Sequence, residues 1–245
     1  MPSPLAPSAR APAPALVPVW RRLLWPGLTT LAMLAALLAL GTWQLQRRAW
    51  KLGVLAQIER GEAAPAVPLP AEPRPYTKVF VEGRLRADLT ALYGVEVRPT
   101  PSGPTLGARL LAPLERPGAE PVIVDRGWVP TDPPRPVAPV PDPVRIEGYV
   151  RAPEKPLTFG AKDDPLARRF YALDPAAVGE ALGVRRVAPF ALVALGDVPP
   201  GTYPEPARTL PRPSNNHLMY AFTWFGIAGA LVFVFALYCR KVLRP

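Results

Sequence analysis

The sequence contains one histidine, His217, and one cysteine, Cys239. This scarcity excludes a Ser-His-Asp or Cys-His active site in a soluble domain. It also excludes a zinc site built from several histidines or cysteines, and a cysteine-ligated iron–sulfur cluster. One cysteine forms no disulfide within the chain, so the core must be held by packing alone.

Phosphate-binding loops are missing as well, since neither a G-x-G-x-x-G nor a Walker pattern occurs. The acidic doublet Asp163-Asp164 lies beside Lys162 and Pro165, a setting typical of a solvated turn, with a general acid/base pair as the alternative. The net charge of +10 is not accompanied by an aromatic-basic binding motif. We therefore predict no nucleic-acid partner.

Two stretches carry no charged residue, Trp25 to Leu45 and Leu218 to Tyr238, each 21 residues long. As helices they would be roughly 30 Å long, the thickness of the hydrocarbon core of a bilayer. The alternative for the first is a cleaved signal peptide, but its apolar run is too long. The alternative for the second is a buried core helix, yet it shows no polar face. Two transmembrane helices are therefore predicted.

The predicted fold class is a membrane protein, in which two transmembrane α-helices flank an α+β soluble domain with a mainly antiparallel sheet. Six prolines between Met1 and Pro18 indicate a disordered arm. The predicted segments are a cytoplasmic arm 1–22, transmembrane helix 23–45, helical extension 46–62, extracytoplasmic domain 63–217, transmembrane helix 218–238 and cytoplasmic tail 239–245.

Basic residues near the spans predict the orientation. The two tails contain six basic residues and no acidic one: Arg10, Arg21, Arg22, Arg240, Lys241 and Arg244. Both termini are therefore expected to be cytoplasmic, in a multi-pass protein of the cell's inner membrane. Arg47, Arg48 and Lys51 lie on the side placed outside and favour the opposite orientation.

Between the spans, short runs rich in Val, Leu, Tyr and Phe alternate with Pro and Gly, which is typical of β-strands. The runs are 77–85, 91–97, 108–114, 122–128, 144–150 and 187–195. Their spacing favours antiparallel meanders, because no long helix lies between them to make parallel crossovers. Asp174-Pro175 and Gly183 frame a short helix over 174–182. Proline-rich 131–143 and 199–213 are predicted loops.

His217 stands at the outer mouth of the second span, with Tyr220 and Trp224 following at helical spacing. This arrangement suits haem, whose iron takes a neutral imidazole and whose macrocycle prefers aromatic walls. Arg47, Arg48 or Arg212 could contact the propionates. The alternative is an interfacial histidine, with Tyr220 and Trp43 as aromatic-belt anchors.

Small residues on both spans predict that the two helices pack together through them. They are Ala32, Ala35, Ala36 and Ala39 on the first span, and Gly226, Gly229 and Ala230 on the second. Such pairing would bring the segment from Trp43 to Arg48 next to that from Asn215 to Tyr220. One site at the membrane interface would result.

These two segments resemble the Surfeit-locus cytochrome c oxidase assembly proteins. Gly41-Thr-Trp-Gln-Leu-Gln-Arg47 with Trp50-Lys51 is similar to the family's first-helix signature, and Asn215-Asn-His-Leu-Met-Tyr-Ala-Phe-Thr-Trp224 to its second. Val81-Glu-Gly83, Val124-Asp-Arg-Gly-Trp-Val-Pro130 and Phe170-Tyr171 resemble the intervening domain. The resemblance covers residues 25–238. Asp125 departs from it, since the family usually has asparagine there.

The resemblance implies a factor, not an enzyme, that helps to mature haem–copper (cytochrome c) oxidase. It would receive haem a from haem a synthase and help to insert it into the catalytic subunit. The family's histidine is linked to haem binding, which implies that His217 ligates the haem iron. From the residues themselves we expect Trp224, Tyr220, Arg47 and Trp43 to complete the haem site. The turn Arg126-Gly127-Trp128 is either a docking surface for the oxidase or a strand end with a buried tryptophan.

Two rival functions remain open from the residues. A scaffold that stabilises an oxidase intermediate without touching haem would not need His217. A membrane-anchored enzyme that uses carboxylates would depend on Asp163 or Asp164 instead.

Overall fold

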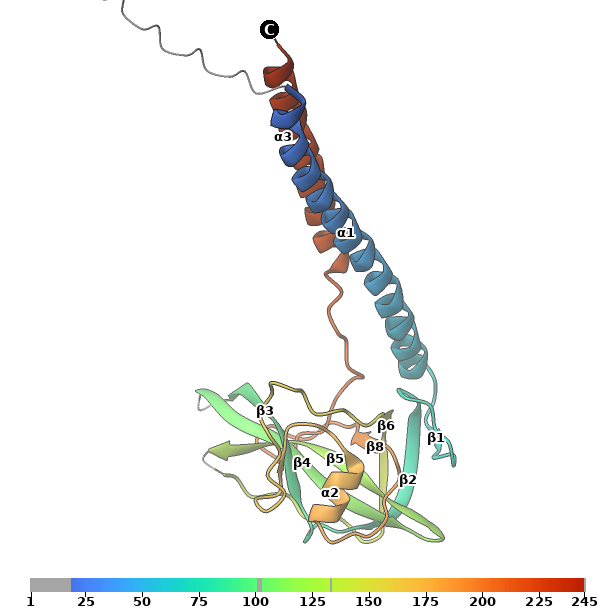
Figure 1. Ribbon diagram of the computed structural model, residues 1–245. Helices are drawn as coiled ribbons and strands as arrows, with labels where there is room; N and C mark the ends of the chain where they lie inside the picture. The colour runs from blue at the N-terminus through green and yellow to red at the C-terminus, as the bar shows by residue number, and fades with distance from the viewer. Residues whose placement is uncertain (1–18, 101–102, 133, 245) are drawn as a thin grey trace, which may run out of the picture. The chain divides into compact units, whose positions relative to one another are not determined.

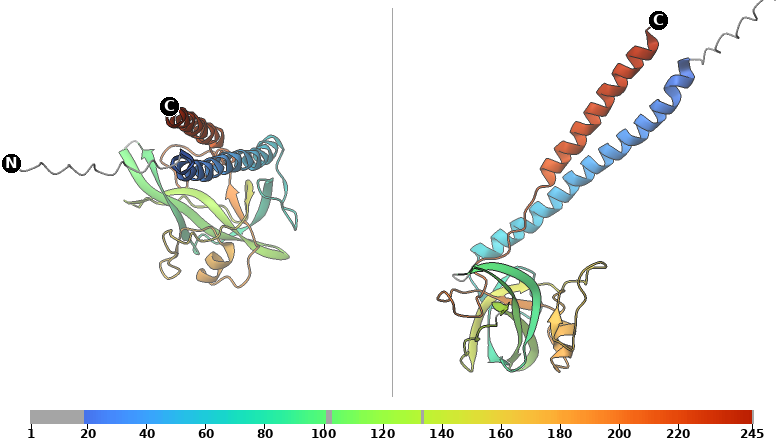
Figure 2. Two further views of the ribbon diagram at one scale, coloured as in Figure 1. Left: turned by 45° about the horizontal axis from the view of Figure 1, so that its top comes forward. Right: turned by 90° about the vertical axis from the view of Figure 1, so that its left-hand side faces the viewer.

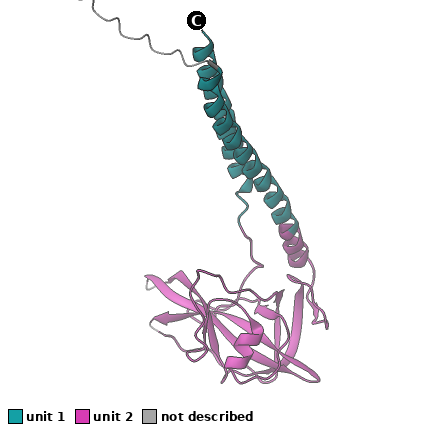
Figure 3. Ribbon diagram, viewed as in Figure 1, with its two compact units in different colours: residues 1–53, 214–245 teal, residues 54–213 magenta. Residues whose placement is uncertain are grey.

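The computed structural model describes residues 19–100, 103–132 and 134–244. Most of the predicted arm, residues 1–18, lies outside the described residues. The chain divides into two compact units, which Figure 3 shows in different colours. We call them the helix-pair unit, residues up to Gly53 and from Ser214 on, and the barrel unit, Val54–Pro213.

The helix-pair unit contains most of α1 (Val19–Ala63) and all of α3 (His217–Leu243). The two helices lie side by side and run in opposite directions (Figures 1 and 2). At one end of the pair the Tyr238 hydroxyl donates a hydrogen bond to the Arg22 carbonyl at 2.9 Å. Both helices are long and apolar enough to cross a membrane. The residues at which they would enter and leave a bilayer stay a prediction.

The helices do pack together, but the predicted small-residue interface is wrong. The buried residues are Leu37, Gly41 and Gln44 on α1, and Ala221 and Ala228 on α3. The predicted small residues are all exposed: Ala32, Ala35, Ala36, Ala39, Gly226, Gly229 and Ala230. Positions 37, 41 and 44 follow the three-and-four spacing of one helix face, and the alanines fall on other faces. Gly41 leaves room for a ring, because a Cβ there would come within 2.5 Å of Phe225.

The barrel unit contains one sheet and a short helix. Its elements are β1 (Val67–Pro68), β2 (Lys78–Leu85), β3 (Ala91–Thr100), β4 (Gly103–Arg116), β5 (Ala119–Asp132), β6 (Val144–Arg151), β7 (Arg169–Phe170), α2 (Pro175–Ala181) and β8 (Ala191–Ala194). The strand order is β1-β2-β6-β8-β5-β4-β3-β7. An additional pairing of β2 with β4 closes β2, β6, β8, β5 and β4 into a barrel, whose curvature is visible in Figures 1 and 2.

Sheet content and helix α2 agree with the sequence prediction. Asp174 caps α2, because its Oδ1 accepts a hydrogen bond from the Ala176 N–H at 3.0 Å. The barrel closure was not predicted. The sheet is mainly antiparallel, as predicted, but a parallel crossover also occurs, since β8 pairs parallel with β5 while antiparallel to β6. The segment between β5 and β8 is long enough for this crossover because it contains β6 and α2.

The core consists of three clusters of buried side chains. One cluster draws on all five barrel strands and fills the interior: Val79, Val81, Leu114, Val122, Val124, Val150, Ala188, Phe190 and Leu192. A second cluster, which includes Ile123 and Phe170, packs α2 on the outside of the sheet. A third joins Ile58, in the last turns of α1, to Tyr149 and Val193. The end of α1 is therefore part of the barrel unit.

Candidate functional site

The site begins at the first residue of α3. His217 is partly buried there, and its Nδ1 lies 2.7 Å from the Oε1 of Gln44 on α1. Gln44 itself is only 9% exposed, because it occupies the packed face of α1. A hydrogen bond between the two helices thus holds the imidazole of His217.

The Oε1 of an amide only accepts, so the Nδ1–H of His217 is the donor in this hydrogen bond. In the neutral imidazole this tautomer has its lone pair on Nε2. No other described residue forms a hydrogen bond with the ring. A neutral imidazole with one nitrogen held and the other available is the form that binds a metal ion.

Two buried polar atoms close to His217 in sequence have no hydrogen-bond partner among the described residues. They are Asn215 Oδ1 and Trp224 Nε1. Trp224 follows His217 by two helical turns and is partly buried. Because a buried orphan group is unfavourable, these atoms are candidates for contact with a ligand or a lipid headgroup.

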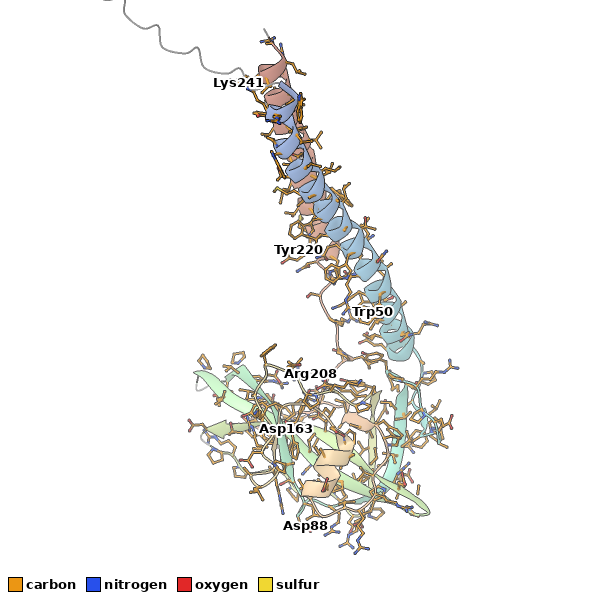
Figure 4. The ribbon with its side chains drawn as sticks, in the orientation of Figure 1. Trp50, Asp88, Asp163, Arg208, Tyr220 and Lys241 are labelled. Atoms are coloured by element: carbon orange, nitrogen blue, oxygen red, sulfur yellow. The ribbon has the colours of Figure 1, made fainter. Side chains whose placement is uncertain are left out.

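The other predicted site residues lie on exposed parts of the helix pair. Trp43 and Tyr220 are 52% and 56% exposed, and Figure 4 shows Tyr220 on α3. The Arg47 guanidinium lies 4.0 Å from the ring centre of Trp50, an exposed side chain also labelled in Figure 4. No hydrogen bond or ring contact joins these side chains to His217 in the part of the chain that the structure describes. Their roles stay predictions.

Arg212 has a partner in the barrel unit. Its Nη2 lies 2.7 Å from the Oε2 of Glu62, near the end of α1. Arg48 forms no ion pair with the described residues. Of the arginines suggested for propionates, Arg212 is therefore already engaged by a carboxylate.

Gln44 was not singled out from the sequence, although it lies within the quoted first-helix signature. The signal that could have revealed it is a polar side chain in an otherwise apolar run. At spacings of three and seven from Gly41 and Leu37, it falls on their face of the helix.

The residues around His217 fit a haem better than a bare metal ion. Among the described residues, no three His, Cys, Asp or Glu side chains come close enough to hold a metal ion. A haem brings its own four nitrogen ligands and needs one protein nitrogen, which His217 Nε2 offers. The exposed aromatic side chains of the helix pair provide apolar surface, and the Trp224 N–H provides an unused donor.

The barrel unit contains polar groups that are mostly paired. Asp125 is fully buried and forms an ion pair with the Nε of Arg109, while its Oδ1 accepts from the Gly127 N–H at 3.1 Å. Burial raises the pKa of the Asp125 carboxyl, and the Arg109 guanidinium opposes this shift. These groups stabilise the barrel wall.

A second network links β3, β6 and the chain after β6. The Tyr93 hydroxyl donates to Glu154 at 2.7 Å, and Arg151 forms an ion pair with the same carboxylate. Burial alone would favour the protonated acid, but Tyr93, Arg151 and the Leu173 N–H together outweigh it and lower the pKa of Glu154. Burial raises the pKa of Tyr93 to about 12.

The acidic doublet cross-links a loop of the barrel unit, where Figure 4 labels Asp163. Asp163 Oδ1 accepts from the Tyr171 N–H at 2.5 Å, and Asp164 Oδ1 accepts from the Ala167 N–H at 3.0 Å. Each carboxylate thus holds backbone of its own loop, as a structural turn requires.

Arg126-Gly127-Trp128 is not a turn, and Trp128 cannot be a docking surface because it is fully buried. The three residues lie inside β5, where Leu110 pairs with Gly127 and Leu111 with Asp125. Arg126 is therefore the extra residue of a β-bulge. At Gly127 the backbone φ is +128°, and a Cβ would collide with the Glu205 backbone.

The family model described as "SURF1 family" matches residues 31–229, which include both helix ends and the whole barrel. The chain belongs to the SURF1 family. The resemblance predicted from the two helix-end motifs is confirmed.

Three relatives in the SURF1 family are similar to this chain over most of its length. Surfeit locus protein 1 of Xenopus tropicalis is 27% identical and covers 85% of this chain and 73% of its own length. A SURF1-like protein of Monosiga brevicollis is 29% identical and covers 82% of this chain and 83% of its own length. A SURF1-like protein of Rickettsia bellii is 28% identical and covers 88% of this chain and 91% of its own length. Each match covers more than four fifths of this chain.

Proposed function

We propose that this SURF1 family member is an assembly factor for haem–copper (cytochrome c) oxidase that holds haem a through His217. The observation that carries the proposal is the bond between Gln44 and His217, which leaves Nε2 as the available nitrogen. Family membership supports the role in oxidase assembly, which the resemblance of the two motifs implies.

The chain's own residues would act as a holder. Gln44 would keep the imidazole in one tautomer, and the helix pair exposes the aromatic side chains of Trp43 and Tyr220. A single imidazole makes reversible attachment possible, because the iron has one protein bond to lose on transfer. Haem a bears a long apolar tail, so a carrier at the membrane interface would keep that tail out of water.

The proposed partners are haem a synthase as donor and the catalytic subunit of the oxidase as acceptor. The proposed location is the inner membrane, with both termini cytoplasmic. In support, the Tyr238–Arg22 bond places together the two helix ends that carry the basic residues Arg21, Arg22, Arg240 and Lys241. The same proposal makes the chain a carrier and not an enzyme.

An optical spectrum tests the haem ligand. The protein is purified in detergent from cells that make haem a, as wild type and as His217→Ala. We expect a haem spectrum in the wild type that is lost in the variant, because removal of His217 leaves the chain without an imidazole. Intrinsic fluorescence of both proteins checks that the fold is kept.

Oxidase assembly is measured in the same two strains. Loss of both haem and assembled oxidase in His217→Ala supports the carrier. If neither protein binds haem while oxidase assembly still depends on the chain, the haem proposal fails and the scaffold function takes its place. If instead Asp163→Asn or Asp164→Asn abolishes function while His217→Ala stays active, the carboxylate enzyme is favoured.

A further inference from the structure

One end of the barrel opens into a cavity of about 350 Å³. Four of the five closed strands contribute to its wall, through Leu85 on β2, Arg126 on β5, Val144 and Ile146 on β6, and Ala194 on β8. The apolar members of this set also pack against the interior core cluster. The cavity is therefore the mouth of the barrel, which is a common place for a ligand.

Two proline-rich segments form the rest of the wall. Pro139 and Val140 come from the connection after β5, and Tyr203, Pro204 and Pro206 come from the segment after β8. The Ala138 N–H donates to the Tyr203 carbonyl at 2.7 Å, which ties the two segments together. Predicted as loops, they form ordered sides of an apolar recess.

Arg126 brings a positive charge into this recess. The residue is only 7% exposed, and its one hydrogen bond is a long contact of 3.4 Å from Nη2 to the Ala138 carbonyl. No ion pair joins it to a carboxylate anywhere in the described chain. Burial lowers the pKa of the Arg126 guanidinium. A buried guanidinium without an anion is unfavourable, and the bulge in β5 places it there.

The carboxylates and the other arginine of the cavity do not compensate Arg126. Asp197 is paired with Arg208 at 3.1 Å, and Glu147 is exposed. Arg145 is exposed and paired with Glu82 at 3.1 Å. Arg126 is therefore the one buried cation in the wall of this cavity.

We propose that the barrel mouth binds a small organic carboxylate, whose anion pairs with Arg126 and whose apolar body lies on Leu85, Val144 and Ile146. A carboxylate matches the forked donors of a guanidinium, and the cavity volume is at the lower end of the range for small ligands. The site lies wholly in the barrel unit and does not depend on haem binding at His217.

Titration of the full-length protein in a neutral detergent tests the proposal, with hexanoate as the probe and hexanamide as the uncharged control. We expect hexanoate to bind saturably and to raise the melting temperature, and hexanamide to do neither. Arg126→Met keeps the apolar stem but removes the charge, and should weaken hexanoate binding by at least roughly tenfold. Arg145→Met, from the same cavity wall, should bind hexanoate like the wild type.

The stability of the ligand-free variants separates a binding role from a structural one. If Arg126 is held for a ligand, Arg126→Met should melt at or above the wild-type temperature, since it removes an unpaired buried charge. A lower melting temperature would show that Arg126 serves the fold and would overturn the proposal. So would hexanoate binding that is absent from the wild type or unchanged in Arg126→Met.

Discussion

The barrel unit and the helix-pair unit differ in how fully their polar side chains are paired. In the barrel, buried and partly buried carboxyl groups meet arginines, as Asp125 meets Arg109 and Glu154 meets Arg151. In the helix pair, one uncharged bond between Gln44 and His217 leaves a ring nitrogen without a partner. Paired charges stabilise a fold, whereas a held but unsaturated nitrogen is suited to binding. In the barrel, Arg126 is likewise a polar side chain without a full set of partners.

The largest effect is expected where the barrel has no freedom to adjust. Gly127→Ala should destabilise the barrel by more than about 4 kcal/mol, because φ is +128° and the new Cβ would collide with the Glu205 backbone. Gly118→Ala is the matched control, since its φ of +69° is strained but its Cβ would meet open space. That variant should lose about 1 kcal/mol. Denaturant titration followed by near-UV circular dichroism measures both, and equal losses would contradict the proposed collision.

The next effect concerns the buried ion pair of the barrel. Asp125→Ala should cost about 3–5 kcal/mol, because it leaves the Arg109 guanidinium without its carboxylate. Asp125→Asn should lose less, since an amide oxygen can still accept from Arg109 and from the Gly127 N–H. The midpoints of chemical unfolding of the two variants are compared. A larger loss in Asp125→Asn would show that charge, and not hydrogen bonding, dominates this site.

A smaller effect, on binding and not on folding, is expected in the helix pair. Gln44→Leu should weaken haem binding by roughly 10- to 100-fold while His217 stays in place, because the ring loses the partner that orients it. Gln46→Leu provides the control, since Gln46 is exposed on the same helix. Haem titration followed by absorbance measures both affinities. Equal affinities in the two variants would mean that the bond to Gln44 is structural only.

The smallest effect is a change in acid stability. The pKa of Glu154 is lower in the folded protein, so its contribution to stability is complete above about pH 4.5 and is lost as the pH falls through the folded value. Glu154→Gln should therefore unfold with a shallower dependence on pH in the acid range, together with lower stability at neutral pH. Melting temperatures from pH 3 to pH 7 measure the difference. Parallel pH profiles would show that Glu154 contributes no such linkage.

Local patterns were enough to predict most elements of both units. Charge-free runs predicted the two long helices, and short apolar runs separated by Pro and Gly predicted β2 to β6 and β8. The Asp174-Pro175 pair and Gly183 predicted α2. The sequence also indicated His217 as the candidate ligand, because no other histidine exists and because it borders an apolar helix.

Contacts between distant residues could not be predicted in this way. The closure of β2 on β4, the bulge at Arg126 and the face of α1 that meets α3 all depend on register between segments far apart in the chain. A small-residue stripe suggested the wrong helix face because the packing of a helix pair depends on the side chains of both partners together. Gln44 became a candidate only when the two helices were seen side by side.

The sequence by itself determined the two apolar helices, the strand-rich middle and the family, since each follows from the order of residues over short distances or from whole motifs. Tertiary structure alone decided which nitrogen of His217 bonds to Gln44 and where Arg126 is buried. A proton position and a missing counter-ion are properties of a spatial neighbourhood, and only the folded chain brings its members together.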